Sequence, residues 1–209
     1  MKRIFLILYD IDDSKMILLI DNTPDTPSKN YYYRLVDFLK THVPHYKIIR
    51  NMSDYEIIDE SDIEGIILSG SPMRIGVPIH TNKLRIALTS FTRFPNVPLY
   101  GICFGFQLMN VVYGGTVKPF GREVCEVHKV GRCDVQFCFN DMIDKLAPGF
   151  TVEGVANIDR RKVICHIRNQ HLKRVGTLFH PEADGDACHY LRNFLIDMCN
   201  VKLKEKPTK

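Results

Sequence analysis

The most informative stretch of this sequence is Val97-Pro98-Leu99-Tyr100-Gly101-Ile102-Cys103-Phe104-Gly105-Phe106-Gln107-Leu108-Met109. It begins as a short apolar run from Val97 to Ile102, which is typical of a buried strand. After Cys103, apolar residues recur at helical spacing from Phe106 onward. A strand, a sharp turn and a helix form the arrangement that exposes a nucleophile at the tip of a strained turn. Cys103 is therefore a candidate nucleophile, and the positive end of the helix dipole favours its thiolate.

Composition indicates one globular unit. The chain has 209 residues, of which 45% are hydrophobic and 25% charged, and this is enough to bury a full core. Much of the net charge of +4 comes from lysines near the C-terminus. That pattern predicts a solvated tail and no nucleic-acid partner.

Cysteine usage favours a reducing compartment. The chain has seven Cys, without a CxxC pair or a His/Cys cluster at zinc spacing. We therefore expect neither a disulfide framework nor a metal site, and we expect a cytoplasmic location. No apolar run is long enough to span a bilayer, so no membrane partner is expected.

The first half alternates between apolar runs and helical patterns. We expect strands at 16–22, 46–49, 62–68 and 97–102, and helices at 29–42, 83–94 and from 106 to Gly114-Gly115. A short acidic helix or turn covers 55–61. This alternation predicts an α/β fold with an open parallel sheet flanked by helices. Residues 1–15, with a possible edge strand at 4–9, are expected to form an N-terminal extension. The domain covers 16–200, and 201–209 form a basic tail.

The second half is richer in short β runs. They lie at 125–130, 133–139, 150–156, 163–166 and 174–179, and a closing helix follows at 187–199. Their lengths and turns predict a small mixed or antiparallel addition at one edge of the parallel sheet.

Two further residues complete a candidate catalytic set. His180 ends an apolar run, Pro181 prevents that strand from continuing, and Glu182 can reach back to orient the imidazole. With Cys103, they supply a nucleophile, a base and an orienting group. A buried Cys is usually inert and a lone His is more often structural. Only Cys103, however, lies between two glycines that allow a tight turn and close approach of a substrate.

These motifs resemble the signatures of class I glutamine amidotransferases. The resemblance rests on Gly101-Ile102-Cys103-Phe104-Gly105-Phe106-Gln107, Gly114-Gly115, Phe179-His180-Pro181-Glu182 and the turn Leu68-Ser69-Gly70-Ser71-Pro72. Within the family, Phe120-Gly121-Arg122-Glu123 is most similar to the glutaminase part of GMP synthases, followed by the anthranilate and aminodeoxychorismate synthase subunits. GMP synthases carry a Ser-His-Gly-Asp stretch that contacts their partner domain, and its best local match here is Ala156-Asn157-Ile158-Asp159, without the His.

The resemblance implies a flavodoxin-like domain that hydrolyses the side-chain amide of glutamine through a Cys103 thioester. It assigns His180 and Glu182 to the triad and the N–H groups of Ser71 and Phe104 to the oxyanion hole. Gly70 and Gln107 would hold the substrate. No cofactor or metal is implied.

The resemblance also implies a partner. The 209 residues contain no phosphate-binding Gly-rich loop. We therefore expect a separate synthase, ATP-dependent and similar to GMP synthase, to accept the ammonia for nucleotide biosynthesis. Two alternatives stay open at this point. One is a stand-alone γ-glutamyl hydrolase or peptidase, and the other is a regulatory relative without turnover.

Overall fold

The computed structural model describes residues 15–23, 31–75, 82–183 and 185–204. The possible strand at 4–9 and nearly all of the expected extension lie outside the described residues. None of the helices in the described part is long and apolar enough to cross a membrane.

The first half alternates strands and helices as the sequence predicts. Its elements are β1 (Met16–Ile20), α1 (Tyr31–His42), β2 (Tyr46–Ile49), α2 (Met52–Glu56), η1 (Glu60–Asp62), β3 (Ile63–Leu68), α3 (Asn82–Arg93), β4 (Leu99–Ile102) and α4 (Phe104–Val112). The acidic segment near 55–61 is divided between α2 and the 3-10 turn η1. Each of the expected strands and helices of this half is present.

The second half contains more β structure than the sequence indicates. It comprises β5 (Thr116–Val124), β6 (Val127–Val130), β7 (Cys133–Gln136), β8 (Phe139–Lys145), β9 (Thr151–Ile158), β10 (Arg161–Asn169), β11 (Arg174–Thr177), η2 (Gly185–Ala187) and α5 (Cys188–Asn193). The closing helix continues as a π-helix, η3, over Phe194–Met198.

The central sheet has the order β2-β1-β3-β4-β11-β10-β9. Its first five strands are parallel, and β10 and β9 extend it antiparallel. The predicted α/β fold with a mixed addition is therefore confirmed. One assignment was wrong, because 174–179 does not belong to the addition. Its strand β11 pairs in parallel with β4, with Thr177 opposite Ile102, and both strands end at the same edge.

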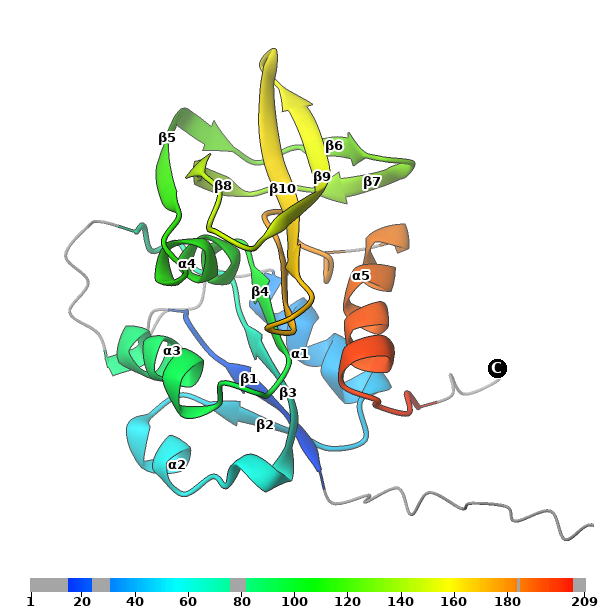
Figure 1. The fold of residues 1–209 in the computed structure, drawn as a ribbon. Coiled ribbons are helices and arrows are strands. Elements are labelled where there is room, and N and C mark those ends of the chain that lie inside the picture. The colour runs from blue at the N-terminus through cyan, green and yellow to red at the C-terminus, as the bar shows by residue number, and fades with distance from the viewer. Residues whose placement is uncertain (1–14, 24–30, 76–81, 184, 205–209) are drawn as a thin grey trace, which may run out of the picture.

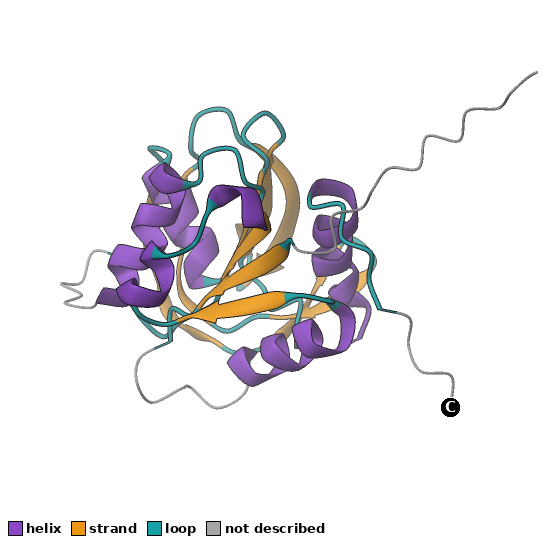
Figure 2. Ribbon diagram, turned by 90° about the horizontal axis from the view of Figure 1, so that it is seen from below, coloured by secondary structure: helices purple, strands orange, loops and turns teal. Residues whose placement is uncertain are grey.

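Helices cover both faces of this sheet (Figures 1 and 2). Helices α1 and α5 lie on one face, and α3 and α4 on the other. Strands covered on both faces must be apolar throughout, and Leu18, Leu19, Ile66 and Ile67 are accordingly buried completely. This rigid core fixes the edge at which β3, β4 and β11 end.

The addition forms a separate β lobe above that edge (Figure 1). Here β5 pairs with β8 and β6 with β7, while the β9–β10 hairpin extends beyond the main sheet. The lobe brings the segment just before β8 against the turn that carries Cys103.

The sequence analysis expected residues 201–209 to form a solvated tail, but the first residues of this segment pack against the domain. Val201 is buried, and the backbone N–H of Lys204 donates to the carbonyl of His42 at 2.9 Å. Leu203 also packs against the core. Two apolar side chains therefore hold the beginning of 201–209 on the domain.

Candidate active site

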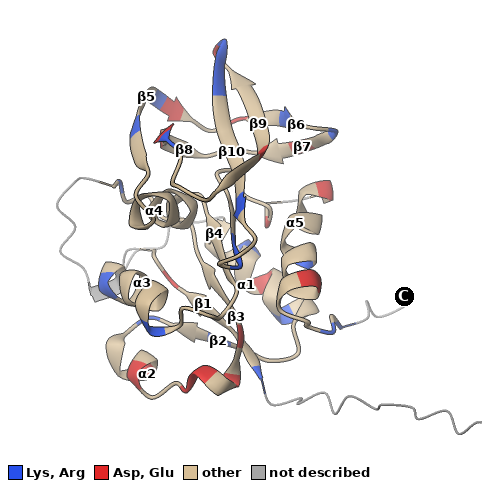
Figure 3. Cartoon of the chain, viewed as in Figure 1, with Lys and Arg blue, Asp and Glu red and all other residues tan. Residues whose placement is uncertain are grey.

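Cys103 lies at the tip of a strained turn between β4 and α4. Its φ of 49° and ψ of −101° are rarely adopted by residues other than glycine, and such strain is typical of functional positions. The turn is held by its own backbone, since the N–H of Cys103 donates to Thr177 of β11 at 2.7 Å. Figure 3 shows that β4 and α4 carry no Lys, Arg, Asp or Glu. The charges around the thiol must therefore come from other elements.

The flanking glycines serve packing. A Cβ on Gly101 would lie 2.6 Å from backbone atoms of Gly105, and one on Gly105 would lie 2.6 Å from the carbonyl oxygen of Leu68. These contacts bring β4, α4 and β3 together. The sequence analysis attributed the glycines to a tight turn and to substrate approach, and the structure supports the first reason.

His180 and Glu182 form a buried pair beside the thiol. The imidazole Nδ1 lies 2.8 Å from Oε1 of Glu182, and both side chains are buried. This contact fixes the ring, and the imidazole interacts electrostatically with the thiol of Cys103. The backbone N–H of His180 donates to Gln136 of β7 at 2.8 Å, so the β lobe helps to hold the base.

The pair is electrostatically tuned to carry a proton. Burial alone lowers the pKa of His180, but the carboxylate of Glu182 and the contact with Cys103 outweigh it and raise the pKa to about 10. The imidazole therefore takes up and holds a proton readily. Such a group stabilises a neighbouring thiolate and can later deliver its proton.

The turn after β3 covers this pair. A Cβ on Gly70 would lie 3.0 Å from Cε1 of His180 and 3.5 Å from Cβ of Cys103, so Gly70 lies directly against both candidate catalytic residues. Asn22 holds the turn, because its backbone N–H donates to Oγ of Ser69 and its side chain donates to the carbonyl of Ser69, both at 2.9 Å. Ser71 lines the same pocket. Phe104, whose N–H begins α4, has its side chain in the core.

Gln107 joins α4 to the β lobe. It lines the pocket, and its amide nitrogen donates to the backbone oxygen of Asp141 in β8 at 2.6 Å. The carboxylate of Asp141 accepts from the guanidinium of Arg74, which follows the β3 turn. Gly70, Ser71, Phe104 and Gln107 thus all lie around Cys103. The stretch 156–159 is elsewhere, at the end of β9 and the turn that follows it.

Two groups of site residues were missed by the sequence analysis. Tyr31 stacks on the imidazole of His180 with ring centroids 3.9 Å apart and an interplanar angle of 19°, although its sequence context indicated only a helix face. Arg74 and Asp141 gave no sequence signal, because the strand that carries Asp141 was not predicted.

The pocket wall also holds a disulfide, which was not expected. Cys125 and Cys138 are bonded, and both line the pocket with Cys103. The reason is the β lobe, which places two cysteines 13 positions apart on neighbouring antiparallel segments. The ligand atoms of Glu123 and these two cysteines lie within 4.8 Å of one another. The remaining five cysteines are unpaired.

Comparisons with known proteins identify the family and the fold. Residues 28–198 match the family model of the class-I glutamine amidotransferases. The GMP synthase (glutamine-hydrolyzing) of Dictyostelium discoideum is 29% identical over 160 residues, covering 66% of this chain and 21% of that protein. The enzyme of the same name from Thermomicrobium roseum is 33% identical over 162 residues, covering 70% and 29%. The chain thus spans about a fifth to a third of the length of these curated relatives.

Solved structures share the fold. A protein from Thermoplasma acidophilum that is assigned as one subunit of a GMP synthase superposes with a TM-score of 0.64 at 22% identity, covering 90% of this chain and 94% of that one. A glutamine amidotransferase from Thermotoga maritima gives 0.62 at 14% identity, covering 88% and 83%.

Proposed function

The chain belongs to the class-I glutamine amidotransferase family, and we propose that it hydrolyses the side-chain amide of glutamine and supplies the ammonia to a synthase. The observation that carries this proposal is the buried His180–Glu182 pair, with nitrogen and oxygen 2.8 Å apart, beside a cysteine on a strained turn. A core histidine needs no such partner, and a structural cysteine needs no positive φ.

The chemistry proposed passes through an imidazolium–thiolate pair. The thiol of Cys103 gives its proton to His180, and the resulting thiolate attacks the amide carbonyl of glutamine. The N–H groups of Ser71 and Phe104 face the developing oxyanion, and each donor in such a site contributes roughly 3 kcal/mol. Gly70 leaves room for this geometry, and Gln107 helps to hold the substrate.

The second half of the cycle returns the proton. His180, with its pKa raised to about 10, gives its proton to the leaving nitrogen and then deprotonates the water that cleaves the γ-glutamyl thioester. Glu182 keeps the imidazole oriented during both transfers. No cofactor or metal is required for these steps.

The acceptor of the ammonia is proposed to be a separate synthase, ATP-dependent and related to GMP synthase, which would place the chain in nucleotide biosynthesis. The similarity to GMP synthases and the motif Phe120-Gly121-Arg122-Glu123 support this choice. The partner would dock beside 69–74, which line the pocket, and beside 183–186, because ammonia would have to leave at that edge of the sheet. The five unpaired cysteines support a cytoplasmic location.

The test is ammonia release from glutamine by the purified chain, with and without a candidate synthase and its acceptor. Cys103→Ala and His180→Asn should abolish release. Cys188→Ala, which removes a half-buried cysteine in α5, should leave it intact. Release that survives Cys103→Ala would overturn the proposal. Full release from glutamine or γ-glutamyl peptides without any synthase would favour the stand-alone hydrolase, and thiol labelling without turnover would favour the regulatory relative.

A further inference from the structure

We propose that the Cys125–Cys138 disulfide is a reversible redox modification site in the wall of the active-site pocket. Its state controls the reactivity of Cys103. This inference goes beyond glutamine hydrolysis, because the bridge and the thiol can both be measured without glutamine.

The bridge lies at a cross-strand position that suits it. Glu126 and Phe137 exchange both of their backbone hydrogen bonds, at 3.2 and 2.9 Å. The next pair, Cys125 and Cys138, therefore falls at a non-hydrogen-bonded position, where opposite Cα atoms are closest. Their Cα atoms are 4.2 Å apart. The hairpin thus holds the two cysteines within reach of each other, and the bridge adds a local restraint on the backbone at Cys138.

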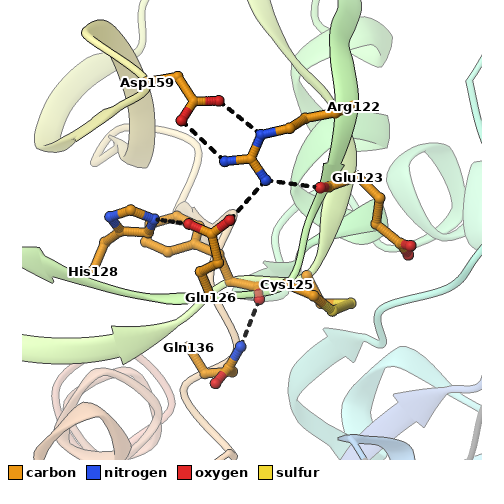
Figure 4. A network of polar contacts seen from close by, with 9 residues as sticks. Arg122, Glu123, Cys125, Glu126, His128, Gln136 and Asp159 are labelled. Carbon is orange, nitrogen blue, oxygen red and sulfur yellow. Dashed lines mark hydrogen bonds and ion pairs between the residues drawn. A yellow bond between two sulfur atoms is a disulfide. The ribbon is translucent and has the colours of Figure 1, made fainter.

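The bridge is open to a reductant. Cys125 is exposed and Cys138 is half-buried, and exposed disulfides are the ones that exchange readily. Figure 4 shows Cys125 beside a polar network centred on Arg122, which pairs with Glu126 at 2.7 Å and with Asp159 at 2.7 Å. These ion pairs brace the flanking segments. Opening of the bridge should therefore act locally and leave the lobe folded.

A direct contact connects the bridge to the nucleophile. Sγ of Cys103 donates to the backbone oxygen of Cys138 at 3.2 Å. Only the neutral thiol can donate this bond, and a thiol is a weaker nucleophile than a thiolate. A bridge that holds the Cys138 carbonyl against the sulfur keeps Cys103 in its less reactive form.

The exchange is a two-electron reduction by a dithiol. One thiolate of the reductant attacks the exposed sulfur of Cys125, the S–S bond breaks, and Cys138 leaves as a thiolate that takes up a proton. The second thiolate of the reductant then displaces Cys125, which is protonated in turn. The reductant ends as a cyclic disulfide, and an oxidised dithiol of the same class reverses the reaction.

The experiment measures the alkylation rate of Cys103 by iodoacetamide in the oxidised protein and after dithiothreitol treatment, with the reductant removed and a chelator present. The chelator keeps metal ions from the thiols and Glu123. Trypsin separates the sites, because residues 94–122 contain Cys103 alone, 123–129 contain Cys125, and 133–145 contain Cys138 together with Cys133. Loss of one weak hydrogen bond predicts that reduction accelerates Cys103 alkylation about fivefold.

Variants separate the bridge from other cysteines. In Cys125→Ser and Cys138→Ser, iodoacetamide should alkylate Cys103 at the rate of the reduced protein, with or without dithiothreitol. Neither variant can form the bridge, and both keep the backbone carbonyl of residue 138. Cys133→Ser, which removes the unpaired cysteine of the same hairpin, should keep the response of the unmodified chain.

Two results would overturn the inference. The first is the absence of a 125–138 crosslink in non-reduced peptides after air oxidation. The second is a Cys103 alkylation rate that is the same in the oxidised and reduced protein. If Cys103 responds as expected but glutamine is not hydrolysed, the proposed function fails and the redox site stands.

Discussion

Tyr31 lies flat against the imidazole of His180, with ring centroids 3.9 Å apart and planes inclined by 19°. The first helix of the domain therefore forms one wall around a candidate base that comes from the far end of the chain. Glu182 holds the ring by one edge and Tyr31 holds its face. The two contacts together restrain the orientation of the imidazole.

Loss of this stack should weaken turnover without abolishing it. We expect Tyr31→Ala to lower kcat up to about tenfold with a smaller effect on KM, because an aromatic pair contributes about 0.5–1.5 kcal/mol. Tyr31→Phe keeps the ring and should restore the rate. Tyr33→Ala, at an exposed position of the same helix, is the control. Steady-state glutamine hydrolysis measures all three, and equal losses in Tyr31→Ala and Tyr33→Ala would contradict a positioning role.

A methyl group on Gly70 should disable the site and leave the fold intact. Its Cβ would lie 3.0 Å from Cε1 of His180, so the imidazole must shift in Gly70→Ala, and a misplacement of this kind costs about a hundredfold in rate. The fold should tolerate the change because the contact is with a side chain. Glutamine hydrolysis and thermal unfolding are to be measured together. Normal turnover would show that the ring does not need its present position.

The neighbouring Gly105 has the opposite role. A Cβ there would lie 2.6 Å from the carbonyl oxygen of Leu68, which is backbone and cannot move aside. Gly105→Ala should therefore lower the free energy of unfolding by about 1–3 kcal/mol. Val112→Ala, at a partly exposed position of the same helix, should cost less. Urea unfolding compares the two, and an unchanged midpoint for Gly105→Ala would mean that α4 can move away from β3.

The candidate catalytic set could be proposed from the sequence because its signals are local. Cys103 lies between two glycines, and His180 and Glu182 are two positions apart, so short motifs carry the triad. The sheet explains why they meet, since β4 and β11 are parallel neighbours that end at one edge. The sequence could not indicate that pairing. An apolar run of this length fits a central parallel strand and an edge strand equally well.

Other parts of the site depend on contacts between distant segments. Strand β8 was not predicted because Asn140, Asp141 and Asp144 interrupt its apolar pattern. The contact of Asp141 with Arg74 could therefore not be predicted either. The disulfide was missed because the spacing of Cys125 and Cys138 has no meaning until β6 and β7 form a hairpin. Tyr31 was interpreted as part of a helix face because nothing local to it points toward His180.

The pH dependence of stability offers a test of the His180–Glu182 pair. The pKa of His180 is raised to about 10 from an ordinary 6.5, so between these values the folded chain binds more protons than the unfolded one. Stability from this group is complete below about pH 6.5 and is lost as the pH rises toward 10. Glu182→Gln should remove most of that decline, because burial then lowers the pKa of His180.

Glu153→Gln is the matched control. It removes a carboxylate beside His166, whose pKa is lowered to about 4 by burial, and should keep the decline. Urea unfolding at steps from pH 6 to 10 measures the difference, and parallel curves for all three proteins would mean that Glu182 does not hold the proton on His180.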